Sequence, residues 1–564
     1  MNYQILKKLI NKDSIKYYVI FIFFTHQIFY ISKIGTQIDE YIHIKGVELT
    51  LEKIKKIIDG SAFIDYLNYS DIEFYGYLYE IQVYFFSNLP LFKNLISNFN
   101  FIVNEIDAVY FLRHFYLNLY LVLFLFIIHF YISKIMDTKT ANIFIVILTL
   151  NPIFIGHSMF NHKDITFAIH IFLAFLAYLY YSDKFIIENS LESWRINLIT
   201  SIFIVYPILL RFNAIAFLFL FILSYFVTNF KLLPKHNFLM KNFKLGFSSF
   251  ILLLMGSLPG WPNLIYYYKS LYNTQFKYAW EGNTVINGIY YFSTDFKFNY
   301  IIKVLIYKLP IPILIFLILG LYTVYKLKIK LLINLYLFLF LFLMSFYLFK
   351  PTYYDYFRQY LFLIPIISFL IAIIFSKNFN NNSFQINLNL LFFCVFSIYS
   401  QFGLQEFKYT YLNEFVQEEN IANLSNNCPN GESICGKWST DYYGISGKQI
   451  ITNLQLNDKN FAFSCFYDHT IDDFLFEGST NLNDSSKFNF EGFNYLKNNF
   501  DFASNLLENK FINEIYIIDV HRVGIGNCVD RFTKNYNCTL DNLVSRSYRG
   551  NKVFMAYVHK CVNY

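Results

Sequence analysis

Charged residues are scarce in this sequence. Only 15% of its 564 residues are Asp, Glu, Lys or Arg, whereas about a quarter is usual in a soluble protein. Hydrophobic residues make up 56% and aromatic residues 22%, and the mean hydropathy is +0.37. This balance excludes an ordinary soluble domain and predicts a polytopic α-helical membrane protein.

Nucleotide-binding motifs and internal repeats are also missing. The sequence contains no P-loop and no dinucleotide fingerprint, so we do not expect it to draw energy from a bound nucleotide. The net charge of +7 is spread over short basic segments between apolar runs. It therefore indicates membrane topology, and no nucleic-acid partner is expected.

Eleven apolar runs approach the length of about 20 residues that a helix needs to cross a bilayer. They lie near 15–36, 107–132, 140–155, 165–183, 195–211, 213–230, 245–260, 305–326, 331–349, 359–376 and 386–402. The basic segments fall on the same side at every crossing, which predicts a cytoplasmic N-terminus in the plasma or inner membrane. The first run is interpreted as a retained anchor, because it is longer than a signal-peptide core and no small-residue cleavage site follows it.

The sequence divides into a membrane domain, residues 1–402, and a tail, residues 403–564, which eleven crossings place outside. The first outer loop, residues 37–106, contains amphipathic stretches that we expect to lie as helices at the membrane interface. The tail is predicted to be a small α/β domain. EIYIIDV and KVFMAYVH have strand character, and FNYLKNNFDFASNLLENKF is predicted to be helical.

Cysteine is rare, and six of the seven cysteines lie in the tail: Cys428, Cys435, Cys465, Cys528, Cys538 and Cys561. An even number restricted to the outer segment favours disulfides in an oxidising compartment. Six cysteines allow fifteen pairings, and the sequence does not choose among them. A zinc site is the competing interpretation, although CPNGESIC lacks the usual close ligand spacing.

Polar residues that topology does not explain collect at the predicted outer ends of the helices. Asp39 and Glu40 follow the first run and Arg113 enters the second. Arg211 lies between the fifth and sixth runs, and Arg358 precedes the tenth. Ionisable residues near membrane helices are costly, so this pattern predicts one polar site at the outer face. The site is expected to lie in contact with membrane lipids.

Asp39 and Glu40 are the candidate catalytic residues. A carboxylate at this place can act as a general base that takes a proton from an attacking hydroxyl. The pair also fits a solvated loop, and the sequence favours neither residue strongly as the base.

The stretch NPIFIGHSMFNHKD, residues 151–164, joins the third and fourth runs. If it is helical, His157, Asn161 and Asp164 share one face. If it is a turn, Asn161 to Asp164 open the next helix, and its free N–H groups form an anion site with Lys163. A simple helix cap explains one of these polar residues but not all of them.

Arg113, Arg211, Arg358 and Lys163 together offer cations to an anionic group at the membrane surface. Each arginine alone also fits snorkelling or an interfacial anchor. A lipid phosphate is the ligand that such a group of cations suits best. A base beside these cations suggests transfer from a lipid-phosphate donor.

Several segments, in chain order over residues 39–450, resemble the polyprenyl-phosphate-dependent glycosyltransferases of the GT-C fold. In particular, they resemble bacterial relatives of the protein O-mannosyltransferases. The segments are QIDEYIH, NPIFIGHSMFNHKDITFA, GNTVINGIYYFSTDFKFNYI, YDYFRQYLFLIPII, EFKYTYLNEF and TDYYGISGKQ. Thr166, Gln359 and Tyr443 depart from the family pattern, so the resemblance does not identify the substrate.

The resemblance implies an integral membrane glycosyltransferase that uses a lipid-linked sugar and usually inverts the anomeric centre. Its partners would be a polyprenyl-phosphate sugar and a protein, lipid or polysaccharide acceptor. Asp39 would be the base, with Glu40 beside it, and four further residues would line the donor site: His157, Lys163, Asp164 and Arg358. Some GT-C enzymes bind a divalent metal ion, to which the sequence assigns no ligands.

Two other functions are compatible with a multi-pass protein. A transporter of a polar or anionic solute would place its polar residues near the bilayer midplane, often in internal repeats. A membrane-anchored scaffold would not explain why the stretch at 151–164 is so polar. A transferase accounts best for both the position of the polar residues at the outer ends of the helices and the polar stretch at 151–164.

Overall fold

The structure is a computed structural model, and it is mostly helical in the part of the chain that it describes. The described residues are 14–37, 39–60, 77–102, 105–183, 193–232, 236–276, 283–293, 295, 297–352, 355–378, 383–416, 423–424, 434–435, 437–453, 461–464, 488–489, 494–496, 514–520 and 535–562.

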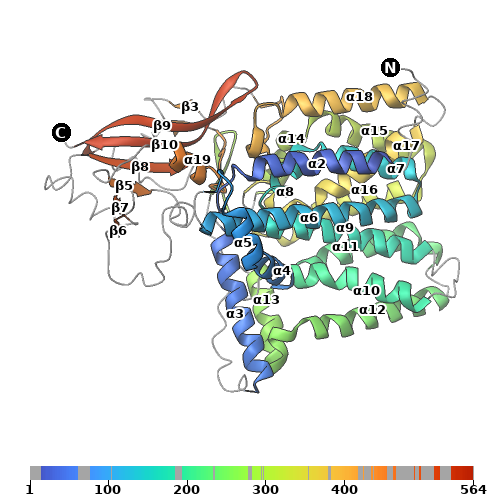
Figure 1. The fold of residues 1–564 in the computed structure, drawn as a ribbon. Coiled ribbons are helices and arrows are strands. Elements are labelled where there is room, and N and C mark those ends of the chain that lie inside the picture. The colour runs from blue at the N-terminus through green and yellow to red at the C-terminus, as the bar shows by residue number, and fades with distance from the viewer. Residues whose placement is uncertain are drawn as a thin grey trace.

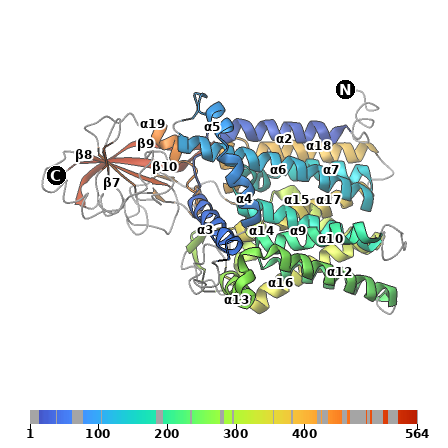
Figure 2. The same cartoon turned by 60° about the horizontal axis from the view of Figure 1, so that its bottom comes forward.

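Apolar helices form a bundle in which many axes run side by side (Figures 1 and 2). Its main members are α2 (Ile15–Ile31), α6 (Glu105–Ile135), α9 (His162–Tyr181), α10 (Ser193–Leu210), α11 (Ala214–Thr228), α12 (His236–Gly256), α16 (Lys330–Phe349), α17 (Leu363–Asn378) and α18 (Ser383–Ser400). Helix α9 is central, since 94% of its most apolar window is buried. The residues that open α9 therefore lie among several helices at one end of the bundle.

By length and composition, four helices in the described ranges can cross a membrane: α6, α9, α12 and α16. The number rises to six if each of two bent pairs is one span. The other five predicted runs form apolar helices of 10–17 residues, fewer than the about 20 residues that a helix needs to cross a bilayer. The predicted number of eleven spans is thus only partly supported, although the shorter α2, α10, α11 and α18 run alongside the longer helices (Figure 1).

The third predicted span is bent. Helices α7 (Thr138–Thr149) and α8 (Pro152–Ser158) meet at 71°. Proline keeps the residue before it out of the helical region, and Asn151 accordingly has an extended ψ of 119°. The Asn151 side chain accepts hydrogen bonds from the amides of Ile153 and Phe154 at 3.0 and 3.2 Å, which caps α8.

A second break separates α14 (Asn299–Lys308) from α15 (Ile311–Leu327), which are inclined by 113°. Pro310 lies between them and again removes a helical hydrogen bond. Before α14, β1 (Asn283–Ile286) and β2 (Ile289–Phe292) form a hairpin. Asn287 and Gly288, both with positive φ, make its two-residue turn, as such turns require.

In the residues of the first outer loop that the structure describes, there are three helices: α3 (Glu40–Ile58), α4 (Tyr77–Ser87) and α5 (Pro90–Ile96). Helix α3 crosses the direction of the bundle helices at one end (Figure 1), the orientation expected of an interfacial helix. Its buried residues Glu40, His43, Val47 and Thr50 share one face. That face packs toward α4 and carries Glu40 into the interior.

The described part of the tail contains a mixed sheet of six strands beyond the same end of the bundle (Figures 1 and 2). The strand order is β6-β7-β5-β8-β10-β9. The strands are β5 (Phe461–Ser464), β6 (Phe488–Asn489), β7 (Asn494–Leu496), β8 (Glu514–Val520), β9 (Asn537–Tyr548) and β10 (Asn551–Val562). A short pair, β3 (Asn423–Leu424) and β4 (Ile434–Cys435), and helix α19 (Gly447–Asn453) precede it.

Strands β8 and β10 agree with the two predicted strands, EIYIIDV and KVFMAYVH. The predicted helix over 493–511 is wrong where the structure describes it, because Asn494–Leu496 is strand β7. This segment pairs in parallel with β5, a non-local contact that overrides the local helical pattern. The remainder of that prediction, 497–511, lies outside the described residues.

One disulfide joins Cys538 in β9 to Cys561 in β10, which face each other across the ladder. Cys394 lies in α18 as a free thiol. Cys428, Cys465 and Cys528 lie outside the described residues. The structure therefore assigns one disulfide, which reduces the fifteen pairings to three.

Candidate functional site

Polar side chains from distant parts of the chain meet where α3, α6 and α9 approach one another. Asp39 and Glu40 open α3, and Arg113 and His114 lie in the first third of α6. Asn161 caps α9, Arg211 directly follows α10, and Arg358 begins the short 3-10 helix η5 (Arg358–Tyr360). Their contacts form two adjacent groups.

The first group surrounds Glu40, whose side chain is fully buried. Arg113 Nε donates to Glu40 Oε1 at 3.3 Å, and the backbone N–H of Gln37 donates to Glu40 Oε2 at 3.0 Å. His114 Nε2 lies 3.2 Å from Oε2, and His162 Nε2 lies 3.4 Å from Oε1. Burial opposes ionisation, but the adjacent histidines hold the pKa of Glu40 well below its ordinary value.

Arg113 connects Glu40 to a second buried carboxylate, Glu80 of α4. Its Nη2 donates to Glu80 Oε2 at 2.9 Å, and His43 Nδ1 lies 3.6 Å from Glu80 Oε1. Burial tends to raise the pKa of Glu80, but Arg113 and then His43 lower it overall. The guanidinium therefore holds α3, α4 and α6 together through two charge-assisted bonds.

The second group surrounds Asp164, which is 1% exposed. Its carboxylate accepts hydrogen bonds from Arg211, from Arg358 Nε at 3.2 Å and from Asn161 Nδ2 at 3.0 Å. Tyr443 Oη also donates to it at 3.3 Å. A buried carboxylate needs such partners, and these bind α9 to segments almost 300 residues away.

Arg358 links Asp39, which precedes Glu40 in the chain, to the group around Asp164. It pairs with Asp39, with Asp164 at 3.2 Å and with Asp355 at 3.1 Å, and its guanidinium lies over the Tyr443 ring, 5.2 Å from the centroid. Asp39 is 23% exposed, in contrast to Glu40. Asp39 is thus the carboxylate of the adjacent pair that a substrate can reach.

The turn before Arg358 is strained. Asp355 and Tyr356 both have positive φ, 52° and 58°, which costs a non-glycine residue on the order of 1–3 kcal/mol. The β1 hairpin and α14 hold the turn: Thr284 Oγ1 accepts from the Asp355 amide at 3.0 Å and Tyr300 Oη from the Tyr356 amide at 2.9 Å. Strain that is retained in this way is typical of functional sites.

The stretch 151–164 takes the turn alternative. Helix α8 ends at Ser158, and Asn161 Oδ1 accepts from the Asp164 amide at 3.1 Å as the cap of α9. Asn161 Nδ2 also lies 2.8 Å from His157 Nδ1 and donates to Tyr443 Oη at 2.8 Å. Asn161 is therefore a cap and also a junction of the network.

Lys163, the second residue of α9, is half-buried, and the charges of Arg211 and Glu80 act on it. His157 is fully buried, with its ring beside those of Tyr409 and Tyr443 at centroid distances of 6.0 and 5.7 Å. The structure thus brings all nine predicted site residues to one region, while their chemical roles stay predictions.

Two residues of the two groups, Glu80 and Tyr443, were not predicted as site members, whereas His114 and His162 were expected in the polar site without an assigned role. His114 and His162 adjoin predicted residues, so their neighbours gave a signal. Glu80 lies in the apolar segment YLYEIQVYFF, where a lone acidic residue signals burial with a partner. Tyr443 had no signal of its own beyond the family resemblance.

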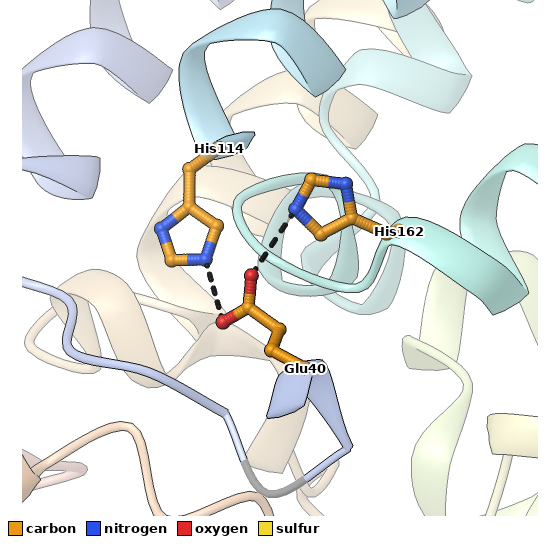
Figure 3. A group of neighbouring side chains, drawn as sticks. All are labelled: Glu40, His114 and His162. Atoms are coloured by element: carbon orange, nitrogen blue, oxygen red, sulfur yellow. Dashed lines mark hydrogen bonds and ion pairs between the residues drawn. The ribbon is translucent and has the colours of Figure 1, made fainter. Parts of the chain in front are cut away.

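The first group also has the composition of a metal site. Glu40, His114 and His162 each offer one ligand atom, and the three atoms lie within 4.8 Å of one another. Figure 3 shows the carboxylate between the two imidazole rings.

Comparisons with known proteins do not assign the chain to a family. No family model matches it, and no curated protein sequence matches it. Among solved structures, it is similar to the crystal structure of the apo form of an Archaeoglobus fulgidus oligosaccharyltransferase. The TM-score is 0.43 and the identity 9%, over 90% of this chain and 70% of that chain. A likeness this weak carries no functional argument, so the function must be inferred from the site itself.

Proposed function

We propose that this protein is an integral membrane glycosyltransferase that moves a sugar from a polyprenyl-phosphate donor to an acceptor at the outer membrane face. One observation carries the proposal: Arg358 lies between Asp39, a partly exposed carboxylate, and Asp164, which also holds Arg211. A base and two guanidinium groups thus adjoin each other at one end of a membrane bundle. The resemblance of segments within 39–450 to GT-C enzymes supports the same class.

Asp39 acts as the general base in the proposed reaction. The acceptor hydroxyl gives its proton to an Asp39 carboxylate oxygen as the hydroxyl oxygen bonds to the anomeric carbon. The bond from that carbon to the phosphate oxygen breaks, and the phosphate leaves with the electron pair. Attack opposite to the leaving group inverts the anomeric configuration.

The arginines and Lys163 stabilise the leaving phosphate. Negative charge grows on it as the bond breaks, and fixed cations nearby lower the energy of that state. Arg358 and Arg211 are held by Asp164 and so need little reorganisation. An incoming phosphate competes with Asp39 for Arg358, which releases the Asp39 carboxylate to act as a base.

Glu40 and Arg113 serve as positioning residues in this proposal. Both side chains are fully buried and bonded to each other, so they do not contact the acceptor. Glu40 directly follows Asp39 and fixes the start of α3. Arg113 in turn holds Glu40 against Glu80.

The proposal is tested in cells with and without the gene. We expect one class of surface glycan or glycolipid to lose a sugar in the deletion strain, and the wild-type gene to restore it. Mass spectrometry of glycans, glycolipids and glycopeptides measures the loss and identifies the acceptor class. An unchanged profile together with altered uptake of a polar solute would instead support a transporter.

A further inference from the structure

Glu40, His114 and His162 form a closed group of three potential metal ligands on three different helices (Figure 3). All three side chains are fully buried. Glu40 is the first residue of α3, His162 the first of α9, and His114 lies within α6. An ion bound to them would join three elements at one point.

The distances in the group fit a small transition-metal ion. Zinc bonds of 2.0–2.1 Å in a tetrahedron place neighbouring ligand atoms about 3.3 Å apart. His114 Nε2 lies 3.2 Å from Glu40 Oε2 and His162 Nε2 lies 3.4 Å from Glu40 Oε1, so each nitrogen has this spacing to a different oxygen of the carboxylate. Two imidazoles and one carboxylate are a ligand set that suits zinc, and not magnesium or calcium.

Two nitrogens of the group, His162 Nε2 and His114 Nδ1, are buried without a hydrogen-bond partner among the described residues. His162 Nε2 faces Glu40 Oε1 at 3.4 Å. The other nitrogen of His162, Nδ1, lies 3.3 Å from Tyr79 Oη. In the tautomer with its proton on Nδ1 toward Tyr79, the ring directs the Nε2 lone pair at the carboxylate. In that tautomer, a cation between Nε2 and the carboxylate satisfies both groups.

Two basic side chains accompany the carboxylates around the group. Arg113 bonds both Glu40 and Glu80, and the charge of Glu80 also acts on Lys163. Arg113 Nε bonds Glu40 Oε1, so Oε2, 3.2 Å from His114 Nε2, is the carboxylate oxygen left to an ion.

We propose that Glu40, His114 and His162 bind one zinc ion, which fixes the start of α3 against α6 and α9. Asp39 directly precedes Glu40, so the ion also fixes the position of Asp39 relative to Arg358. The inference rests on the donor set and does not depend on the proposed transfer reaction. Its test accordingly measures metal and does not measure transfer.

The test is the metal content of the full-length protein, purified in detergent without chelators and measured by mass spectrometry of the elements. We expect about one zinc per chain in the wild type. Glu40→Gln, His114→Gln and His162→Gln should each lower the bound zinc at least tenfold, since loss of outer-shell partners alone costs about 10–100-fold in affinity.

His170→Gln is the matched control, because His170 is also a buried histidine of α9 but bonds to Tyr120. It should keep its zinc. Wild-type protein grown with cobalt provides a measurement that does not depend on how the variants fold: bound Co²⁺ should show the visible absorption of a tetrahedral nitrogen–oxygen site. Wild-type protein without stoichiometric metal, or ligand variants that retain it, would overturn the assignment and leave a hydrogen-bond cluster.

Discussion

At the scale of single residues, Arg113 shows how burial determines what a charged group does. Its sequence position suggested a cation for a phosphate donor. In the structure its guanidinium is fully buried, and Nε and Nη2 bond to different carboxylates, Glu40 and Glu80. A planar guanidinium can reach two acceptors at once, which a lysine ammonium at the end of a flexible chain does poorly.

Arg113→Lys should therefore lower the stability of the protein although it keeps the charge. One buried carboxylate would lose its donor, which costs about 1–3 kcal/mol. The thermal unfolding midpoint of the purified protein in detergent measures the loss. Arg195→Lys is the control, because Arg195 is exposed on α10, and it should leave the midpoint unchanged. Equal midpoints for both variants would show that the double contact of Arg113 contributes nothing.

The residue scale also shows what the sequence could not reveal. Asp39, Glu40 and the 151–164 stretch stood out because polar residues are unusual beside apolar runs. The partners of Asp164 did not, since Arg358 and Tyr443 lie 194 and 279 residues away along the chain. Local patterns carry no information about which distant segment supplies a partner.

At the scale of elements, Gly156 shows how closely α8 approaches the segment η6 (Gln405–Thr410). A Cβ atom at this position would lie 2.0 Å from the Tyr409 backbone nitrogen and 2.7 Å from the Lys408 carbonyl carbon. Neither is a side-chain atom that can rotate away. Only glycine therefore allows this packing, which places the His157 ring beside Tyr409.

Gly156→Ala should force α8 and η6 apart at a cost of about 1–3 kcal/mol, the usual penalty for overpacking. Gly246→Ala in α12 is the matched control, because nothing lies within 4 Å of its added Cβ. Alanine there should raise stability by up to about 1 kcal/mol, its advantage over glycine in a helix. Thermal midpoints that shift in opposite directions support the close packing, and equal shifts would contradict it.

The elements differ in how far local sequence determines them. Apolar runs such as 107–132 and 331–349 predict helices because their length leaves no other way to satisfy the backbone in a bilayer. The helix predicted over 493–511 was wrong at β7, because this strand forms through pairing with β5, a contact that the local sequence does not show. The pairing of Cys538 with Cys561 likewise depends on the β9–β10 register, which the spacing of cysteines does not contain.

At the scale of the whole molecule, the structure is polarised along the bundle. The candidate site and the tail sheet lie toward one end of the helices, and α2 begins at the other end (Figures 1 and 2). The distribution of basic segments predicts that the end where α2 begins faces the cytoplasm. The Cys538–Cys561 disulfide suits an oxidising compartment at the opposite end.

This polarity predicts the accessibility of the two termini. A tag at the C-terminus should bind antibody on intact cells (or on spheroplasts, if an outer barrier covers the membrane). A tag at the N-terminus should bind only after permeabilisation. Fluorescence microscopy of two single-tagged strains measures both. Tags that become accessible together would place both termini on one side and contradict the topology.

The most direct test of the proposed function is transfer by reconstituted protein that carries Asp39→Asn. Asparagine keeps the size of the side chain but cannot accept the acceptor proton, so we expect transfer to fall at least about a hundredfold, as for loss of a general base. Glu52→Gln, an exposed carboxylate on the same helix, should keep wild-type activity. The measurement follows sugar from a panel of polyprenyl-phosphate sugars in vesicles into the acceptor class identified in cells. Full transfer by Asp39→Asn would show that Asp39 is not the base and would contradict the central claim.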